Sequence, residues 1–355
     1  YTLWHTLSLH DALPIWSRVT PLDVLIVDDS PTVRAVLRRL VSRASDLRLV
    51  GEAEDGERAV ELALSLRPDV IVMDLHLPGL SGATATERIH SQRPTPIVVF
   101  TSASDRRAVV EAFRATARGV VGVFSKPHDP AQWEQVGESL LATLRGVRHV
   151  ARESRTPLSD RRELIYRQRL RWIGIGASTG GPAALAEILS GLGGSFAAGI
   201  AVVQHIAEGF EEGLAEWLRQ LTSLDIAVAG DGDELAPAVV RIAPPGAHLR
   251  VENGLVRLDR TSPRWCGHRP SVNALFESMA SLPGAATAGI LLSGMGADGV
   301  NGMEILRRRG ALTLVQDEVS CSVFGMPRAA VDRGVVDAVL TPQEIAVVLR
   351  RGAEE

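Results

Sequence analysis

The sequence has few cysteines and no long hydrophobic runs, and each shortage excludes a class of protein. Its 355 residues include two cysteines, Cys266 and Cys321, which form no CxxC pair and no metal-ligand spacing. This excludes a disulfide framework and favours a reducing compartment. No apolar run approaches the ~18 residues that a membrane helix needs, because a charge, glycine or proline interrupts each one. We therefore expect a cytoplasmic protein without membrane insertion.

A strong net charge is also absent. The formal charge of -4 argues against a general nucleic-acid-binding surface, so no nucleic acid is expected as a partner. The hydrophobic fraction of 45% and charged fraction of 23% are typical of folded protein and exclude a mainly disordered chain. Lysine is scarce: of 38 basic residues, only Lys126 is a lysine. At roughly 100–200 residues per domain, the length predicts two domains, and we expect a monomer.

Residues 22–145 alternate short apolar runs with amphipathic stretches. The runs are rich in valine and isoleucine and mostly uninterrupted, which is typical of strands buried on both faces of a parallel sheet. Five strand–helix units predict a (βα)5, flavodoxin-like domain. The predicted strands lie in residues 24–29, 47–53, 69–74, 96–102 and 120–127.

Two segments depart from this pattern. Residues 1–16 lack both the positive charge of a signal peptide and the later periodicity, and residues 1–21 are expected to be a non-native leader outside the fold. Residues 146–171 are predicted to be a basic linker, because eight arginines and three acids between Arg148 and Arg171 give +5. We interpret it as a solvated tether with a short helix near 160–170. A contact with an acidic partner surface is the alternative.

The alternation resumes in residues 172–355 and predicts a second doubly wound, mostly parallel α/β domain. Residues 248–259 predict a hairpin that turns at Asn253-Gly254. The other apolar runs lie in residues 172–178, 198–205, 225–230, 239–246, 288–294 and 311–317.

Polar residues end the predicted strands of the first domain. Asp28 and Asp29 follow the first strand and Asp74 the third, and parallel strands bring their carboxyl ends to one edge of the sheet. Thr101 and Lys126 end the fourth and fifth strands. Clustered carboxylates repel unless a cation joins them, and oxygen ligands suit Mg²⁺. A carboxylate held by two cations can attack phosphorus. A helix cap is the alternative for a single strand-end aspartate, but it does not explain five matched positions.

These positions carry a family resemblance. The segments VLIVDDSPTVR, DVIVMDLHLPGLSG, FTS and SKP resemble the receiver domain of response regulators. The resemblance implies that Asp74 is the phosphoacceptor and that the Lys126–Pro127 bond is cis. It implies Mg²⁺ as the cofactor for phosphorylation, held by Asp28, Asp29, Asp74 and the main-chain carbonyl of His76. It implies two residues that contact the phosphoryl oxygens, Thr101 and Lys126.

A second constellation begins at Ser178. It lies in a GxSxG motif, Gly176 to Gly180, after an apolar strand and before a helical pattern. A dinucleotide fingerprint fails here, because Thr179 stands where a third glycine is required. A serine nucleophile needs a base and an orienting group, and His205 and Asp298 also follow predicted strands. The alternatives are a serine that only caps a helix and a structural histidine.

The segments GASTGG, VVQH, HRPSV, SGMGADG and QDEVSCSVFGMP resemble the CheB family of chemotaxis protein-glutamate methylesterases. The resemblance implies that Ser178 is the nucleophile, His205 the general base and acid, and Asp298 the carboxylate that orients His205. It implies that the main-chain N–H of Met295 donates to the oxyanion. The residues that would flank the site or line the substrate cleft are Thr179, Met295, His268, Arg269 and Ser271.

The resemblance also implies an activity. The enzyme would hydrolyse γ-glutamyl methyl esters and deamidate selected glutamines on methyl-accepting chemotaxis receptors, with no cofactor for the esterase. A chemotaxis histidine kinase would phosphorylate Asp74, and the receiver domain would act as a lid over Ser178. The alternatives are an adaptor without chemistry, a nucleotide-binding output domain and a DNA-binding regulator. The triad residues argue against an adaptor, and Thr179 argues against a nucleotide-binding domain. The lack of a basic recognition helix argues against a DNA-binding regulator.

Overall fold

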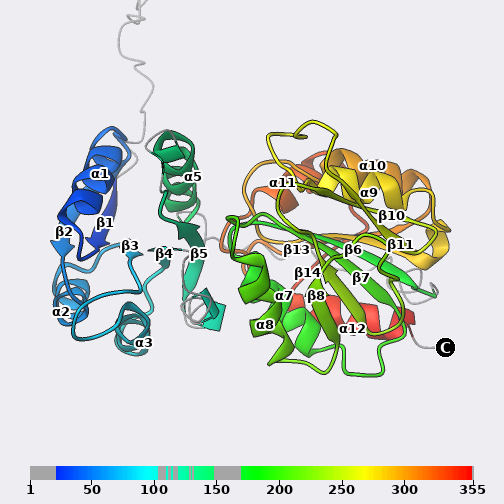
Figure 1. Ribbon diagram of the computed structural model, residues 1–355, viewed down its shortest axis with the longest axis horizontal. Helices are drawn as coiled ribbons and strands as arrows, with labels where there is room; N and C mark the ends of the chain where they lie inside the picture. Colours follow the sequence, from blue (N-terminus) through cyan, green and yellow to red (C-terminus); the bar gives the residue numbers. More distant parts are fainter. Residues whose placement is uncertain are drawn as a thin grey trace, which may run out of the picture.

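The computed structural model describes residues 21–102, 109–110, 113–114, 119–127, 129, 132–147 and 169–353. These residues form two α/β units that lie side by side (Figure 1). The predicted leader, apart from Pro21, lies outside the described residues. Most of the predicted basic linker also lies outside the described residues, and so does most of the short helix predicted near residues 160–170.

The first unit is built on a five-stranded parallel sheet in the order β2-β1-β3-β4-β5. Helices α1 and α5 cover one face and α2 and α3 the other (Figure 1), so each face carries its own apolar core. The predicted doubly wound sheet is confirmed. Its elements are β1 (Leu22–Val27), α1 (Pro31–Ser42), β2 (Leu47–Ala53), α2 (Gly56–Leu66), β3 (Val70–Met73), α3 (Gly82–Gln92), β4 (Ile97–Thr101), β5 (Val120–Ser125) and α5 (Gln132–Gly146).

Short polar side chains start the helices of this unit. The Ser30 hydroxyl accepts a hydrogen bond from the backbone N–H of Val33 and begins α1, while Asp55 accepts one from Arg58 and begins α2. Each satisfies a donor that has no partner within the first turn of its helix. Three residues separate β1 from α1 and two separate β2 from α2, and the polar residues in these turns stay at the sheet edge.

The second unit is built on seven parallel strands in the order β14-β13-β12-β6-β7-β9-β8. Helices α7, α8 and α12 cover one face and α9, α10 and α11 the other (Figure 1). Its strands are β6 (Trp172–Ala177), β7 (Gly199–Gln204), β8 (Asp225–Val228), β9 (Val239–Ile242), β12 (Thr287–Leu291), β13 (Leu312–Gln316) and β14 (Ala338–Leu340). Its helices are α7 (Gly181–Ser190), α8 (Glu211–Arg219), α9 (Val272–Met279), α10 (Val300–Arg308), α11 (Met326–Asp332) and α12 (Pro342–Ala353).

The predicted hairpin is confirmed beside this sheet. Strands β10 (His248–Glu252) and β11 (Leu255–Asp259) pair antiparallel. Asn253 and Gly254 connect them with φ of 53° and 81°. Positive φ at both central residues matches the twist of a two-residue hairpin turn, which explains this residue pair.

The strand order places a switch point at β6. The chain leaves β6 toward β7 on one side, and β12 later pairs on the other side. Crossover helices on the two faces diverge at such a point and leave a crevice at the carboxyl end of the strand. Ser178 is the first residue after β6 and therefore lies in that crevice.

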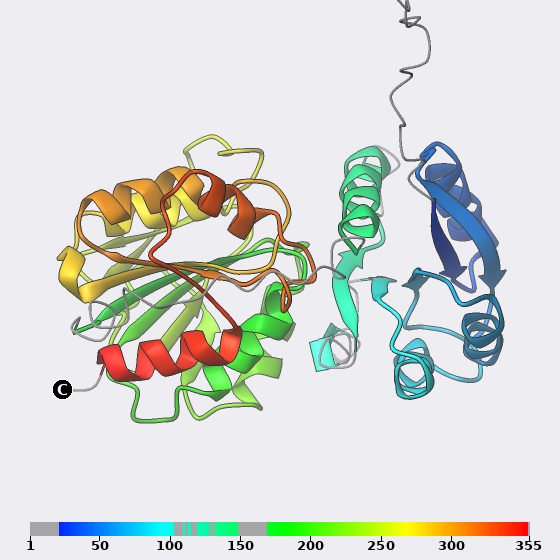
Figure 2. The same cartoon turned by 180° about the vertical axis from the view of Figure 1, so that it is seen from behind.

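The first unit contacts the second through β5 and α5 (Figure 2) and through the helical residues Val109, Val110 and Phe113. The Phe113 ring stacks on Trp217 with centroids 5.9 Å apart and meets Phe210 edge-on at 6.4 Å. These side chains are buried in the apolar core of the second unit. The two units thus share an aromatic contact, which is the kind of anchor that dominates protein interfaces.

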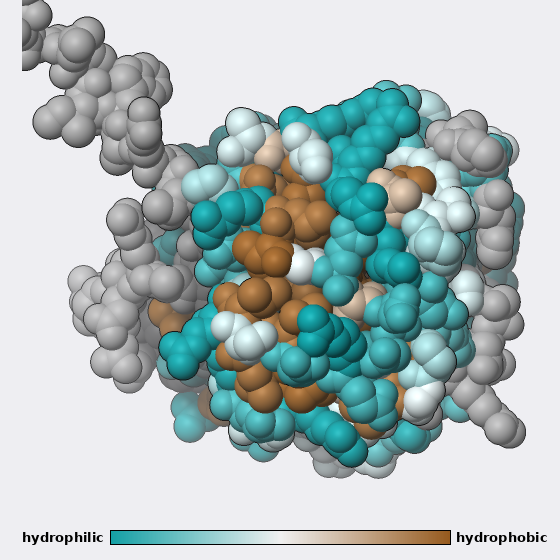
Figure 3. All heavy atoms as spheres, turned by 90° about the vertical axis from the view of Figure 1, so that its left-hand side faces the viewer, coloured by the Kyte–Doolittle hydropathy of each residue, from teal (hydrophilic) through white to brown (hydrophobic). Residues whose placement is uncertain are grey.

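The side of the first unit that faces away from the second is shown in Figure 3. Apolar and charged side chains mingle there, and β2 is the edge strand of the sheet. Arg48 pairs with Asp23, and Arg38 pairs with Glu52, along this strand. Charges beside an edge strand discourage pairing with another chain. Among the described residues, no helix is long and apolar enough to cross a membrane.

Candidate active site

Ser178 is held by backbone contacts on both sides of its turn. Its N–H donates to the Ser293 carbonyl at 3.0 Å, and its own carbonyl accepts from Gly181 at 2.9 Å. Gly180 completes the turn with a φ of 79°, a left-handed conformation that favours glycine. The loop after β12 approaches closely, since a Cβ on Gly294 would lie 2.7 Å from the Ser178 Cβ. The serine is thus fixed on a sharp strand-to-helix turn.

His205 and Asp298 form a buried pair beside this turn. The His205 Nε2 lies 2.9 Å from the Asp298 Oδ2, and both side chains are less than a tenth exposed. A carboxylate only accepts, so Nε2 carries the proton and Nδ1 is left as the acceptor. Nδ1 is buried and has no hydrogen-bond partner among the described residues. No hydrogen bond joins it to the Ser178 hydroxyl in that part of the chain, as is common in enzymes without substrate.

The Asp298 carboxylate also caps helix α9. Its Oδ1 accepts from the Ser271 hydroxyl at 2.8 Å and from the Asn273 N–H at 3.1 Å, and its Oδ2 accepts from the Val272 N–H at 2.7 Å. Burial opposes ionisation, but the hydrogen bonds from His205, Ser271 and Val272 outweigh it and hold the pKa of Asp298 below its ordinary value. A charged, oriented acceptor therefore stands behind His205.

Two predicted cleft residues have different surroundings. His268 stacks face to face on His205, with centroids 3.8 Å apart and planes at 4°. Burial and the neighbouring His205 lower the pKa of His268 to about 4, so its ring is neutral at physiological pH. Ser271 was expected to line the cleft, and this expectation is wrong. The residue is 0% exposed, and its hydroxyl points at Asp298. Its geometry is that of a residue that positions Asp298.

A cavity of about 560 Å³ opens in front of these residues. The predicted cleft residues on its wall are Thr179, His268, Arg269 and Met295, together with Ser178 and His205. The Met295 side chain is 45% exposed, and its backbone N–H donates no hydrogen bond within the described residues. A free N–H beside the serine is what an oxyanion requires.

Three residues at this edge were not identified from the sequence. The Gln204 Nε2 donates to the Ser178 carbonyl at 2.7 Å and to the His205 carbonyl at 3.0 Å. The Ser293 hydroxyl donates to the Thr179 carbonyl at 2.7 Å, and the Ser293 N–H donates to Gln316 at 2.8 Å. Gln204 precedes His205 in VVQH, Ser293 opens SGMGADG and Gln316 opens QDEVSCSVFGMP, so all three lie inside motifs named above. Their hydrogen bonds form only in the folded protein, so no local pattern in the sequence reveals them.

The receiver unit gathers its own set of polar residues. One carboxylate oxygen from each of Asp28, Asp29 and Asp74 lies within 4.8 Å of the others. Lys126 Nζ lies 2.5 Å from Asp74 Oδ2 and 2.8 Å from Asp28 Oδ2. Burial raises the pKa of Asp28 despite Lys126, as expected of carboxyls crowded away from water. Three close carboxylates fit a hard cation such as Mg²⁺.

The remaining receiver residues border this acidic group. The Thr101 hydroxyl is buried without a hydrogen-bond partner in the described part of the chain, which suits a residue waiting for an oxygen-rich group. His76 is exposed, and its N–H donates to Asp74 at 3.2 Å. The expected cis bond before Pro127 is absent, because among the described residues only the Arg269–Pro270 bond is cis. The X–Pro preference for trans, about 0.5–1 kcal/mol, agrees with this correction.

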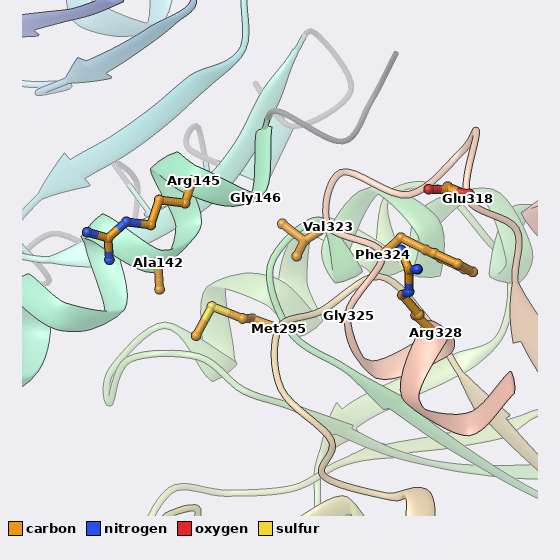
Figure 4. Close-up of a pocket in the computed structure, with 9 residues that line it drawn as sticks. All are labelled: Ala142, Arg145, Gly146, Met295, Glu318, Val323, Phe324, Gly325 and Arg328. Atoms are coloured by element: carbon orange, nitrogen blue, oxygen red, sulfur yellow. The ribbon is translucent and has the colours of Figure 1, made fainter. Parts of the chain in front are cut away.

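The receiver forms the opposite wall of the Ser178 cavity. Thr143 of α5 lies within hydrogen-bond distance of Thr179, with 3.3 Å between the two hydroxyl oxygens. A second cavity of about 250 Å³ lies next to it, between α5 and the loop that leads to α11. Figure 4 shows Ala142 and Arg145 on one side of this second cavity, and Met295 and Val323 facing them. The described arrangement therefore encloses the serine between the two units.

Fold and site together define a receiver domain joined to a doubly wound α/β domain with serine, histidine and aspartate at its switch point. Residues 24–136 match the family model of the response regulator receiver domain, and residues 173–349 match that of the CheB methylesterase.

The whole chain has close relatives. A protein-glutamate methylesterase/protein-glutamine glutaminase of Anaeromyxobacter dehalogenans is 42% identical over 93% of this chain and 96% of its own length. One of Geobacter metallireducens is 38% identical over 94% and 99%. The solved catalytic domain of the Thermotoga maritima CheB methylesterase is 36% identical and covers 51% of this chain and 97% of its own, with a TM-score of 0.49. The chain belongs to the CheB methylesterase family.

Proposed function

We propose that the protein is a phosphorylation-regulated protein-glutamate methylesterase that also deamidates selected glutamines. The observation that carries the proposal is the buried His205–Asp298 pair beside Ser178 at the switch point of the sheet. The family relationship supports the reaction class, and the geometry of the described residues supports the role proposed for each. The substrates would be methyl-accepting chemotaxis receptors.

The proposed reaction starts with a proton transfer to His205. Its Nδ1 is the ring nitrogen left free to take the Ser178 proton, while Asp298 stabilises the imidazolium through Nε2. The serine oxygen then attacks the γ-carbonyl of the esterified glutamate. The Met295 N–H and the N–H groups at the start of α7 would donate to the developing oxyanion.

Collapse of the tetrahedral intermediate breaks the bond to the methoxy group. His205 returns the proton, so methanol leaves and the acyl group stays on Ser178. Water, activated by the same imidazole, then attacks the acyl-enzyme and releases glutamate with the free serine. With a glutamine substrate the leaving group is ammonia, and the other steps are the same.

The receiver would control access to this site. We propose that a chemotaxis histidine kinase supplies the phosphoryl group and that Asp74 accepts it. Asp28, Asp29 and Asp74 would hold Mg²⁺, which shields the charge of the incoming phosphoryl group. Thr101 and Lys126 would contact its oxygens. Phosphorylation would then favour an arrangement in which α5 no longer covers the serine.

Methanol release from methylated receptor membranes tests the activity. Ser178→Ala should lower the rate roughly 10⁶-fold, because triad residues act as a unit. Ser190→Ala is the matched control, since this hydroxyl bonds only to the Ala186 carbonyl of its own helix. Retained activity in Ser178→Ala would refute the assignment. No release by the folded wild-type protein, and no labelling by a fluorophosphonate, would favour a binding adaptor.

A further inference from the structure

The loop from residue 260 to residue 269 places unpaired positive charge on the wall of the cavity. Arg264 and Arg269 both line it, next to His268. Neither guanidinium forms an ion pair with any carboxylate among the described residues. Several other arginines of this unit do, as Arg241 does with Asp225 and Asp233. Arg264 is exposed and Arg269 is half-buried, and no carboxylate of the described residues is in direct contact with either guanidinium.

Arg269 is oriented by the loop itself. Its Nη1 donates to the carbonyls of Ser262 at 3.0 Å and Arg260 at 3.2 Å, while its Nε is buried and donates to no atom of the described residues. Two backbone hydrogen bonds of 2.9 Å join Trp265 and His268 and close the turn between them. An arginine already fixed in place loses little conformational freedom when it binds a planar anion.

The receiver does not neutralise these arginines when it covers the cavity. Among the described residues, every one that it contributes to the wall is uncharged, including Phe113, Phe124 and Thr143. The only acid on the wall, Glu208, is exposed and forms no ion pair with either arginine in the described structure. The arginines therefore remain free for a ligand that enters after the receiver moves.

Binding of the reacting group does not explain the two arginines. A methyl ester and a primary amide are both neutral, so binding the reacting side chain needs no positive charge. A carboxylate elsewhere on the substrate would match a guanidinium, which forms two parallel hydrogen bonds with it. On a helical substrate, residues three or four positions away lie about 5–6 Å from the esterified residue, close enough to share one cavity.

We propose that Arg269, assisted by Arg264, binds an acidic side chain of the substrate polypeptide next to the esterified glutamate. This inference rests on the proposed function and names its substrate class: an acidic segment is preferred to a neutral one. A second source of the same chemistry is the glutamate carboxylate that the reaction itself produces, and the test separates the two.

The test uses two helical peptides, each with one glutamate methyl ester. They differ only in carrying glutamate or glutamine three and four residues away. Full-length protein is activated with acetyl phosphate and Mg²⁺, and methanol release gives kcat/KM for each peptide. We expect the wild-type protein to favour the acidic peptide roughly tenfold to a hundredfold, the usual range for a charge-assisted hydrogen bond. Raised salt should reduce this preference.

Substitutions of the two arginines test whether they cause the preference for the acidic peptide. Arg269→Gln and, independently, Arg264→Gln should reduce the ratio between the peptides, because the rate on the acidic peptide should fall more than the rate on the neutral one. Arg309→Gln is the control, because this exposed arginine ends α10 and does not line the cavity. An equal loss on both peptides would show a structural role for the loop and would overturn the proposal.

Two further measurements, product inhibition and protection of Ser178 from a probe, separate the source of the anion from the proposed reaction. If Arg269→Gln removes inhibition by demethylated peptide but keeps the preference for the acidic peptide, the anion is the product, and the proposal is wrong. Protection of Ser178 from a fluorophosphonate probe by each peptide tests binding without turnover. Stronger protection by the acidic peptide, even without methanol release, would support the subsite and contradict only the proposed reaction. Equal protection would overturn the subsite.

Discussion

At the scale of single residues, the amide of Gln204 joins the backbone of the proposed nucleophile, Ser178, to that of the proposed base, His205. Its Nε2 donates both to the Ser178 carbonyl at 2.7 Å and to the His205 carbonyl at 3.0 Å. The side chain is 3% exposed, so water does not replace these bonds readily. Gly181 allows the close approach, because a Cβ there would lie 2.2 Å from the Gln204 Oε1. Gln204 therefore acts as a positioning residue for the serine turn and the histidine.

Replacing Gln204 with methionine tests this role. The variant keeps the volume but loses both donors, so the turn of Ser178 and the start of the His205 loop are no longer tied. We expect kcat for methanol release to fall about tenfold to a hundredfold with little change in KM, since small misplacements of reacting groups cost that much. The rate of labelling by a fluorophosphonate should fall in parallel.

A purely structural role would give a different pattern. Thr313→Val is the comparison, because Thr313 is also buried on a strand of this sheet and donates to Asp337 at 2.9 Å. This variant should lower Tm and leave kcat close to wild type. Loss of kcat in proportion to Tm in both variants would show that Gln204 matters only for stability.

The sequence located the candidate site residues better than it predicted their contacts. Ser178, His205 and Asp298 lie in motifs with recognisable spacing, and the structure brings their turns together. Ser271 was expected in the cleft, although its hydroxyl faces Asp298 across 27 positions of sequence. A side chain's direction depends on how α9 packs against the loop after β12. No local pattern of sequence encodes that packing.

At the scale of secondary structure, the parallel strands were predictable because they are buried on both faces. Continuous valine- and isoleucine-rich runs distinguish such strands from half-exposed ones, as β6 and β7 illustrate. The hairpin followed from Asn253-Gly254. The order of strands was not predictable: β9 lies between β7 and β8, although it follows both in the chain. Crossovers of similar length permit either order, and long-range packing decides.

Helix α8 offers a test of the closed arrangement. A Cβ on Gly213 would lie 2.4 Å from the Cγ1 of Val109, a receiver residue, so Gly213→Ala should push the receiver away from the second unit. Alanine also favours a helix over glycine by about 1 kcal/mol, so the helix itself should not be weakened. We expect methanol release by the unphosphorylated variant to rise severalfold.

A second substitution, in the receiver, should relieve the clash. Combining Gly213→Ala with Val109→Ala removes the Cγ1 atom and should return the unphosphorylated rate toward that of wild type. The control is independent of phosphorylation, because acetyl phosphate is omitted throughout. An unchanged rate in Gly213→Ala would show that the receiver contact at α8 does not limit access to Ser178.

At the scale of the whole molecule, one strand joins the proposed phosphorylation pocket to the receiver face that covers the Ser178 cavity. Strand β5 contributes Val120 to Phe124 to the wall opposite Ser178, and it ends beside Lys126, which bonds Asp74 and Asp28. A phosphoryl group on Asp74 would compete for the Lys126 ammonium. Moving Lys126 would move the end of β5, and β5 lies in the covering face. The two sites are thus mechanically adjacent although they belong to separate domains.

Asp74→Asn separates the regulation from the chemistry. The amide cannot accept a phosphoryl group, so we expect the variant to keep the basal rate of methanol release and to lose stimulation by acetyl phosphate and Mg²⁺. Glu61→Gln is the matched control, because Glu61 lies exposed on α2, away from the pocket and the covering face. Removing divalent metal with a chelator should abolish stimulation of the wild-type protein in the same way. Undiminished stimulation of Asp74→Asn would place the switch elsewhere, while the esterase assignment would stand on Ser178 alone.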